Sequence, residues 1–258
     1  MSRCRFSGFL VDCFNLTKSA YNKRKIFNFL PGMLLSQNQI LKHRKNGKII
    51  IDPFNEKNLK TTSYDVTLGE WYWKEKAPRG RHTVHNLYDE DSTRSVWGGP
   101  YRAVPAGDLR KDWGIELKNI PDNKDVILLE PGETILAHTK EFIGGKDICV
   151  AKMYARSSMG RNFVEVCKDA GWGDVGYFNR WTMEVTNNSQ HYAIPLVVGR
   201  RIAQMVFYQV EPLVNQKIDY VGEGGKYQTS QDLEVLKREW NPEMMIPQMQ
   251  RDWEVWEN

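Results

Sequence analysis

The sequence is poor in features that would assign a chain at once to a common class. Its 258 residues include only four cysteines, which stand far apart and form no C-x-x-C pair. This spacing excludes the usual zinc sites and offers no disulfide framework, so we expect free thiols and a reducing, cytoplasmic environment. No apolar run is long enough to span a bilayer, and no membrane partner is expected. The cysteines are Cys4, Cys13, Cys149 and Cys167, the last two lying among apolar neighbours that predict burial.

Strong charge of one sign is also lacking. The net charge is +4, and the 36 basic residues are dispersed along the chain. A nucleic-acid interface needs a basic patch or stripe, so no nucleic-acid partner is expected, whereas a polyanionic small molecule fits this charge. Residues 1–32 are locally basic but lack the apolar core and cleavage site of a secretory signal. We interpret them as an N-terminal extension, with an organellar transit peptide as the less favoured alternative.

Short β-type segments dominate the rest of the chain. A capping box at Ser36 and Gln39 predicts a helix over residues 37–45, which Gly47 ends. A second helix is predicted over residues 230–240. Short strands separated by turn residues, without helices between them, are typical of an antiparallel barrel or jelly roll. The predicted strands are 48–52, 63–68, 126–129, 133–138, 148–155, 163–166, 181–187, 193–197 and 202–209.

One region departs from this pattern. Residues 74–113 are rich in glycine, proline, charge and aromatic residues, and Gly98-Gly99-Pro100 interrupts them. Glycine and proline residues that interrupt a segment in this way are typical of loops and turns. We therefore predict a long surface insertion that carries a hairpin.

Two neighbouring segments carry most of the side chains suited to binding phosphate and activating water. Arg156-Ser157-Ser158-Met159-Gly160-Arg161 offers two hydroxyls and two guanidinium groups, which hold phosphate oxygens. Asp174 and Glu184 follow at a separation of ten residues, and a carboxylate held near a substrate activates water. Taken singly, these residues are better explained as a solvated loop, a turn former and an exposed strand residue. Together they predict a hydrolytic enzyme that handles a nucleotide.

Further segments extend the pattern in a fixed order along the chain. They are residues 33–42, 51–69, 129–139 and 199–207, and the motif Gly225-Lys226-Tyr227-Gln228. With the two segments above, this order resembles the dCTP deaminase branch of the trimeric dUTPase-like superfamily. The resemblance covers about residues 33–231, which leaves residues 232–258 as a C-terminal extension.

The resemblance implies a fold and an assembly. The fold is a distorted, mostly antiparallel β-barrel with a few short helices, in one domain over residues 33–231. The assembly is a homotrimer with active sites between subunits, and nine tryptophans and ten phenylalanines leave ample apolar surface for it to cover. The insertion at 74–113 has no counterpart, and residues 222–231 correspond to a mobile tail that closes over the nucleotide.

The resemblance also implies roles for residues. Glu184 takes a proton from the water that adds to C4 of cytosine and passes it to N3 and the leaving ammonia. Ser157 and Arg161 orient this carboxylate and the water, and Asp174 completes the catalytic set. The implied substrate-binding residues are Arg156, Ser158, Ala170, Gly171, Trp172, Gln204, Lys226, Tyr227 and Gln231.

Metal enters this interpretation in one way. Deaminases that use zinc carry H-x-E and P-C-x-x-C motifs, and this sequence has neither. We therefore expect no zinc, and Mg²⁺ bound with the triphosphate.

Several alternatives stay open. The Ala170-Gly171-Trp172 lead-in resembles bifunctional members that convert dCTP to dUMP. A dUTPase-type pyrophosphatase without deaminase activity would not need Glu184, and a non-catalytic nucleotide-binding regulator would need neither acid. A dTTP feedback inhibitor is a further implied partner. Gly173, Val175 and Asn179 differ from the family pattern around the base, so an unmodified and a C5-substituted cytosine both remain open.

Overall fold

The computed structural model describes residues 33–78, 80, 84–213 and 219–252. The predicted N-terminal extension and the last residues of the C-terminal extension, 253–258, lie outside this range. Within it, antiparallel strands predominate and the helices are short, so the predicted fold class is confirmed. No helix in these ranges is both long and apolar enough to cross a membrane.

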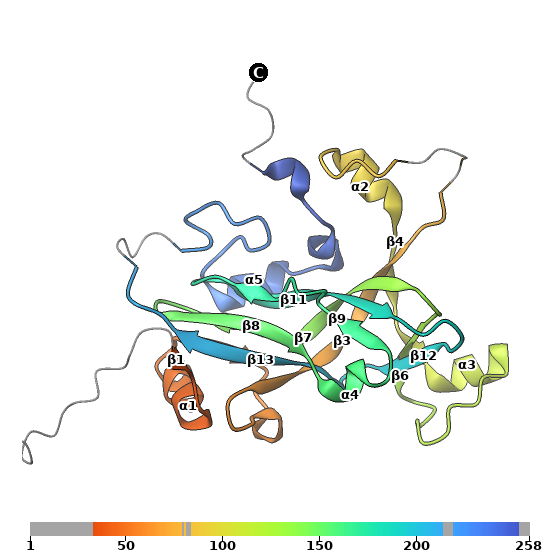
Figure 1. The fold of residues 1–258 in the computed structure, drawn as a ribbon, viewed down its shortest axis with the longest axis horizontal. Helices are drawn as coiled ribbons and strands as arrows, with labels where there is room; N and C mark the ends of the chain where they lie inside the picture. The colour runs from red at the N-terminus through yellow and green to blue at the C-terminus, as the bar shows by residue number, and fades with distance from the viewer. Residues whose placement is uncertain (1–32, 79, 81–83, 214–218, 253–258) are drawn as a thin grey trace, which may run out of the picture. The chain divides into compact units, whose positions relative to one another are not determined.

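Ten strands form the main sheet, and all of their pairings are antiparallel (Figure 1). The order is β10-β8-β13-β3-β7-β11-β9, with β1 beside β13, β2 beside β7 and β4 beside β3. The strands are β1 (Met33–Leu34), β2 (Ile49–Asp52), β3 (Tyr64–Glu75), β4 (Trp97–Arg102), β7 (Thr134–Gly145), β8 (Cys149–Ala155), β9 (Val164–Val166), β10 (Trp172–Gly173), β11 (Phe178–Asn187) and β13 (Arg201–Gln209).

A smaller sheet and several short helices complete the described chain. The sheet has the order β12-β6-β5, from β12 (Ile194–Val197), β6 (Asp125–Leu129) and β5 (Val104–Pro105). The α-helices are α1 (Gln37–Lys45), α2 (Glu90–Val96), α3 (Ala106–Trp113), α4 (Ser157–Gly160) and α5 (Leu233–Glu239). The 3-10 helices are η1 (Glu56–Asn58), η2 (Pro242–Met245) and η3 (Met249–Arg251).

The predicted elements recur, and three strands, β3, β7 and β11, are clearly longer than the sequence indicated. Helix α1 has the predicted bounds, and the Ser36 amide donates to the Gln39 side chain over 2.9 Å. Strand β7 runs on to Gly145 because β2 and the first half of β11 both pair with its second half. Gly144 permits this crowding, since a Cβ there would lie 1.9 Å from the Tyr177 carbonyl oxygen.

The segment 74–113 is structured over most of its length. Strand β3 continues into it as far as Glu75 and pairs with β4, with α2 between the two strands. Helix α3 has a small apolar cluster of its own, in which Ala106 and Leu109 pack with Leu117 and Val126. The segment therefore adds β4 to the main sheet, β5 to the small sheet and α3 beside the small sheet.

The main core lies on one face of the large sheet. Strand β11 sends Trp181, Met183 and Val185 into it, at 4%, 0% and 0% exposure. Cys149 and Cys167 are buried free thiols, as predicted, and burial raises the pKa of Cys149 to about 11. These positions alternate along β11, so the residues between them face the other side of the sheet.

That other face is covered by residues 232–252, which we call the C-terminal cap. Helix α5 lies beside β11 and buries Leu236 against Phe142 and Phe178 (Figure 1). Further along the cap, Met245 at the end of η2 and the next residue, Ile246, pack against Trp73 and Leu136. The strand residues that alternation turns away from the core are thus covered as well.

Candidate active site

Glu184 lies on the cap-facing side of β11, directly across from Leu136 of β7. It lines a cavity of about 400 Å³, which we call the Glu184 cavity. Four separate parts of the chain build this cavity, so only the folded structure assembles it. The lining residues are Leu136, Ala170, Trp172, Gly173, Asp174, Tyr177, Trp181, Thr182, Glu184, Tyr220, Tyr227, Met245 and Pro247.

The surroundings of Glu184 alter its acidity. Burial raises the pKa of its carboxyl above the ordinary value, and its own backbone amide and the Lys168 ammonium act in the opposite direction. A carboxylate with a raised pKa takes up and releases a proton more readily near neutral pH. Such a shift in a cavity marks a candidate acid–base residue.

A strained turn between β9 and β10 supplies one side of the cavity. Cys167, Lys168 and Asp169 have φ angles of 70°, 38° and 65°, a region that residues other than glycine rarely adopt. The Cys167 amide donates to the Glu184 carbonyl over 2.9 Å, which ties the turn to β11. Strain of this kind clusters at functional sites. Ala170, which follows these residues, lines the Glu184 cavity.

The next residues place an aromatic side chain and the second acid. A Cβ on Gly171 would lie 2.4 Å from the Met153 carbonyl oxygen, so this position requires glycine. Trp172 is 56% exposed, and its indole N–H donates to Asp174 over 2.9 Å. The structure therefore brings Ala170, Trp172, Asp174 and Glu184 together in one cavity, as the sequence predicted for a shared site.

A second cavity adjoins the first and shares Asp174 and Tyr220 with it. Its volume is about 770 Å³, and we call it the Lys226 cavity. The Lys226 ammonium forms an ion pair with Asp252 of the cap. The lining residues are Val150, Asp174, Val175, Val210, Glu211, Leu213, Asp219, Tyr220, Glu223, Gly224, Gly225, Lys226, Arg251 and Asp252.

The tail carrying Lys226 is packed against the start of β11. Gln228 is 3% exposed, accepts from the Phe178 amide over 2.7 Å and donates to the Gly176 carbonyl over 2.8 Å. The Asn179 amide group donates to the Tyr227 carbonyl over 2.8 Å. These bonds fix Tyr227 beside the Glu184 cavity. The opening of this tail stays a prediction.

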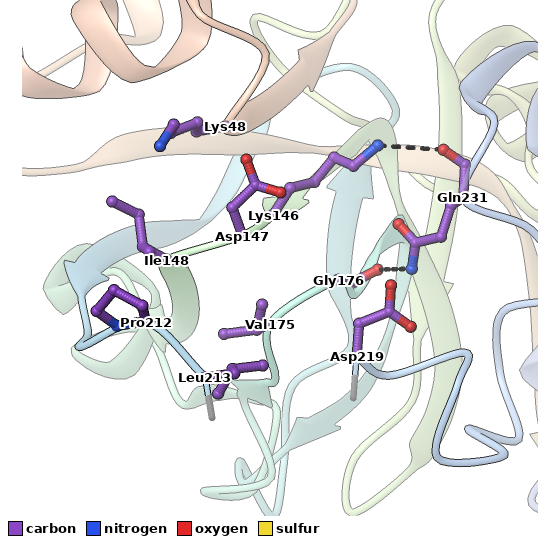
Figure 2. A pocket seen from close by; sticks show the side chains of 10 residues that line it. All are labelled: Lys48, Lys146, Asp147, Ile148, Val175, Gly176, Pro212, Leu213, Asp219 and Gln231. Carbon is purple, nitrogen blue, oxygen red and sulfur yellow. Dashed lines mark hydrogen bonds between the residues drawn. The ribbon is translucent and has the colours of Figure 1, made fainter. Parts of the chain in front are cut away.

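Gln231 lies in a different cavity, of about 430 Å³ (Figure 2). Its side chain donates to the Gly176 carbonyl over 3.0 Å, and Lys146 donates to its backbone carbonyl over 3.2 Å. The predicted contact between Gln231 and a substrate therefore requires a ligand that reaches beyond the first two cavities.

The 156–161 turn, defined as residues Arg156 to Arg161, lies apart from both cavities. Among the described residues that line them, none comes from this turn. Ser157, Ser158 and Arg161 are exposed, and the two serines are the first residues of α4. Another candidate, Gln204, lies on β13 opposite Asp65 and also lines neither cavity.

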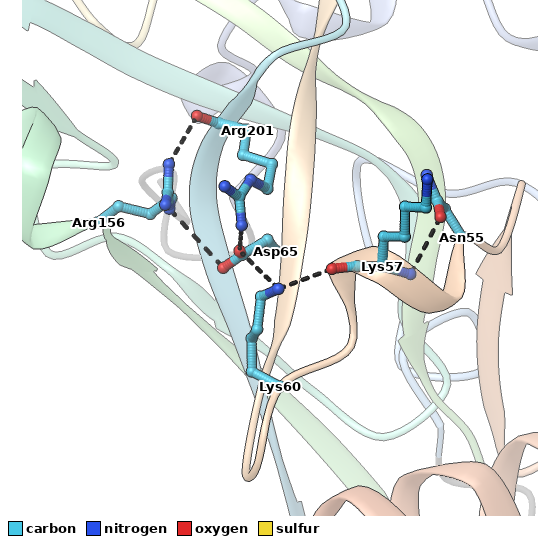
Figure 3. A network of polar contacts seen from close by, with 6 residues as sticks. All are labelled: Asn55, Lys57, Lys60, Asp65, Arg156 and Arg201. Atoms are coloured by element: carbon cyan, nitrogen blue, oxygen red, sulfur yellow. Dashed lines mark hydrogen bonds and ion pairs between the residues drawn. The ribbon is translucent and has the colours of Figure 1, made fainter.

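A buried carboxylate anchors the base of this turn (Figure 3). Asp65 is 3% exposed and lies 2.8 Å from the Arg201 guanidinium and 3.8 Å from that of Arg156. Lys60 approaches it to 4.0 Å. One carboxylate thus faces three cations, which leaves positive charge available to an anion. A cavity of about 270 Å³ adjoins this cluster, lined by Leu68, Arg156, Met159, Pro195, Leu196, Val197, Arg200, Arg201 and Ile202.

Several lining residues were not predicted from the sequence. Tyr177 and Tyr220 give the Glu184 cavity aromatic walls. Trp181 stands at the register shift between Arg180 and Thr182, and it both belongs to the main core and borders this cavity. Tyr177 and Trp181 stand three and seven residues after Asp174, a spacing that could have indicated them. Met245 and Pro247 belong to the cap. The sequence predicted a helix in the cap but carried no signal that these two residues line the cavity.

A partly buried acid, a second acid and an adjoining lysine-lined cavity define a small-molecule site suited to acid–base chemistry. Residues 34–210 match the family model described as dCTP deaminase-like. The chain therefore belongs to the dCTP deaminase-like family.

Relatives in this family carry a more specific name. The chain is 31% identical to "dCTP deaminase, dUMP-forming" of Methanococcus aeolicus over 202 residues, covering 76% of this chain and 92% of the relative. It is 30% identical to the protein of that name from Hydrogenobaculum sp. over 183 residues, covering 70% and 85%. The crystal structure of 2'-deoxycytidine 5'-triphosphate deaminase from Agrobacterium tumefaciens is also similar, with 16% identity, a TM-score of 0.43, and coverage of 72% of this chain and 50% of that one.

Proposed function

We propose that the protein hydrolytically deaminates dCTP and releases dUMP. The observation that carries this proposal is the environment of the Glu184 carboxylate. This carboxylate lies in a cavity with aromatic walls, where burial raises its pKa. Membership of the family and the names of its relatives support the substrate. A pyrimidine ring matches a cavity of this size and lining.

The proton steps balance with Glu184 as shuttle. Its carboxylate takes a proton from water, and the hydroxide adds to C4 of cytosine while N3 accepts the proton. Glu184 then carries the proton of the new C4 hydroxyl to the exocyclic amine, so that ammonia leaves and the C4 carbonyl of uracil forms. A raised pKa serves both directions of this exchange.

Asp174 is proposed to serve the second reaction. It lines both cavities, so a base beside Glu184 would extend its phosphates past Asp174 toward Lys226. A carboxylate there would direct water at the α-phosphate, breaking the bond to the β-phosphate and yielding dUMP and diphosphate. Lys226 would exchange its partner Asp252 for a phosphate oxygen.

Magnesium is proposed to enter with the substrate. Among the described His, Cys, Asp and Glu side chains, no three are grouped to hold a metal ion. The Lys226 cavity nevertheless carries several carboxylates, including Asp174 and Asp219, that suit the outer ligands of a Mg²⁺–triphosphate. No proton step above passes through the metal.

The proposed site is completed by a second copy of the chain in a homotrimer. The 156–161 turn has the groups that bind phosphate, yet it lines neither cavity of its own chain. In a symmetric ring, the turn of one copy would meet the cavity of the next. Ser157 and Arg161 would then reach the carboxylate of the neighbouring Glu184.

The test is product analysis with matched variants. Purified protein with dCTP and Mg²⁺ should yield dUMP and ammonia, resolved by chromatography from dCTP and dUTP. Asp174→Asn should stop at dUTP, and Glu184→Gln should leave dCTP intact while still hydrolysing added dUTP. Hydrolysis of dUTP without ammonia release from dCTP would identify a pyrophosphatase instead. Binding without either reaction would identify a regulator.

A further inference from the structure

The C-terminal cap forms one wall of the Glu184 cavity, although it lies beyond residues 34–210, which match the family. Met245 and Pro247 line the cavity together with Leu136, the cross-strand partner of Glu184. This wall therefore comes from residues outside the part of the chain that matches the family model. Its side chains limit what fits beside Glu184.

This wall is held in place by packing and by hydrogen bonds. Met245 is 3% exposed and clusters with Trp73 and Leu136. The Trp73 indole N–H donates to the Pro242 carbonyl over 2.9 Å, before Met245 in the chain. After it, the Gln248 amide donates to the Tyr227 hydroxyl over 3.2 Å. Fixation on both sides gives the cavity a defined boundary there.

The order of strands decides which edge of a pyrimidine this boundary meets. Strand β11 pairs with β9 on one side and with β7 on the other. The turn that carries Ala170 follows β9, whereas Leu136 belongs to β7 and contacts Met245. In cytosine, C4 lies between N3 and C5. If C4 faces Glu184 and N3 faces the Ala170 side, C5 points toward Leu136 and Met245.

We propose that Met245 is a specificity-determining residue that bounds the C5 edge of the bound pyrimidine and disfavours substituents there. This inference rests on the proposed function, because it takes the base position from the deamination geometry. It decides between the two bases left open by the sequence in favour of unmodified cytosine.

The decisive measurement is substrate discrimination after the wall is shortened. Met245→Ala removes three heavy atoms, and the ratio of kcat/KM for 5-methyl-dCTP over dCTP should rise about tenfold, the scale of one methyl group in an apolar pocket. Met244→Ala is the matched control, since Met244 neither lines the cavity nor joins the buried cluster. Its ratio should equal that of the wild type. An unchanged ratio in Met245→Ala would overturn the proposal.

Two further variants separate a wall from a merely structural role. Met245→Leu keeps the volume and should retain the wild-type ratio, while Pro247→Ala, at a less buried position, should raise it without unfolding the cap. If Met245→Ala fails to fold, the Pro247→Ala result decides. A ratio that rises in Met245→Leu as much as in Met245→Ala would contradict the size argument.

A binding measurement distinguishes failure of this inference from failure of the proposed function. Calorimetry in the Glu184→Gln background compares dCTP with 5-methyl-dCTP without turnover. Adding Met245→Ala should improve the relative affinity for 5-methyl-dCTP about tenfold. If the wild type releases no ammonia yet this shift occurs, the proposed deaminase activity is wrong, whereas the proposed role of Met245 is supported. If the protein deaminates dCTP but shows no shift, only the proposed role of Met245 is wrong.

Discussion

The Glu184 cavity and the 156–161 turn contain the two chemical halves of the predicted site, and they differ in how the fold presents them. The cavity combines residues from β7, β11, the strained turn and the cap, and it partly buries its acid. The turn is one local segment whose serines and Arg161 stay exposed above the buried Asp65.

This difference follows from the chemistry of each half. A carboxylate must lose water to gain a raised pKa, which requires walls from distant segments. Phosphate-binding hydroxyls and guanidinium groups need reach and charge, which a short exposed turn provides. An exposed turn is also free to serve a neighbouring chain. If the two halves act on one substrate, inactivating either half should impair the same reaction.

The largest effect is expected from Glu184→Gln, which keeps the shape and removes the acid. Deamination should fall by about 10²- to 10⁴-fold, since the lost group moves the proton in each step. An ammonia-release assay measures it, and calorimetry should show dCTP binding nearly intact. Glu165→Gln on β9 is the control, because that side chain is exposed and lies outside both cavities. Turnover within a few-fold of wild type would exclude Glu184 as the shuttle.

A second effect is expected when the two halves are inactivated in separate chains. Glu184→Gln and Arg161→Ala chains, each poorly active alone, should regain about a quarter of wild-type activity when coassembled at equal ratio, because one site in four then draws both intact halves. Activity per chain in coexpressed, purified mixtures measures this. Mixtures no more active than the average of the two variants would mean that each site uses one chain.

A smaller loss is expected from Arg161→Ala. A hydrogen bond to a charged group contributes about 1.5–3 kcal/mol, so dCTP affinity should fall by about 10- to 150-fold. Calorimetry gives the affinity, and Arg238→Ala on α5 is a control at an exposed arginine outside both cavities. Unchanged affinity would leave Arg161 as a surface residue.

The mildest test is a pH profile. Glu184 acts as the carboxylate, and burial raises its pKa above the ordinary 4.5. Activity should therefore be lost as pH falls through this raised pKa, with a midpoint in kcat/KM above 4.5. Intrinsic tryptophan fluorescence over the same range checks that the protein stays folded. A midpoint at or below 4.5 would mean that the cavity hydrates Glu184 like a surface residue.

Much of the fold was predictable because strand signals are local. Alternating and β-branched segments predicted the strands that became β6, β8 and β13 to within one residue at each end. Strand β11 was predicted to begin at Trp181 but begins at Phe178, because pairing with β7 at Gly144 extends it. Side-chain periodicity indicates a strand, whereas partner strands set where it ends.

The site was predictable only in part, for a related reason. Asp174, Glu184 and the 156–161 turn stand out because their chemistry and spacing are visible along the chain. Periodicity alone predicted an exposed Glu184, and it indicated correctly that Glu184 points away from the main core. It could not show that the cap covers that face, since no local pattern links Met245 to Glu184.

The sequence by itself thus determined the strands, the antiparallel class and the chemical groups of the site, because propensity, alternation and residue chemistry are properties of short segments. Tertiary structure alone decided which groups share a cavity. It separated the 156–161 turn from Glu184, placed Met245 and Pro247 beside that acid, and raised its pKa by burial. Burial and proximity depend on segments that meet only when the chain has folded, so no local pattern encodes them.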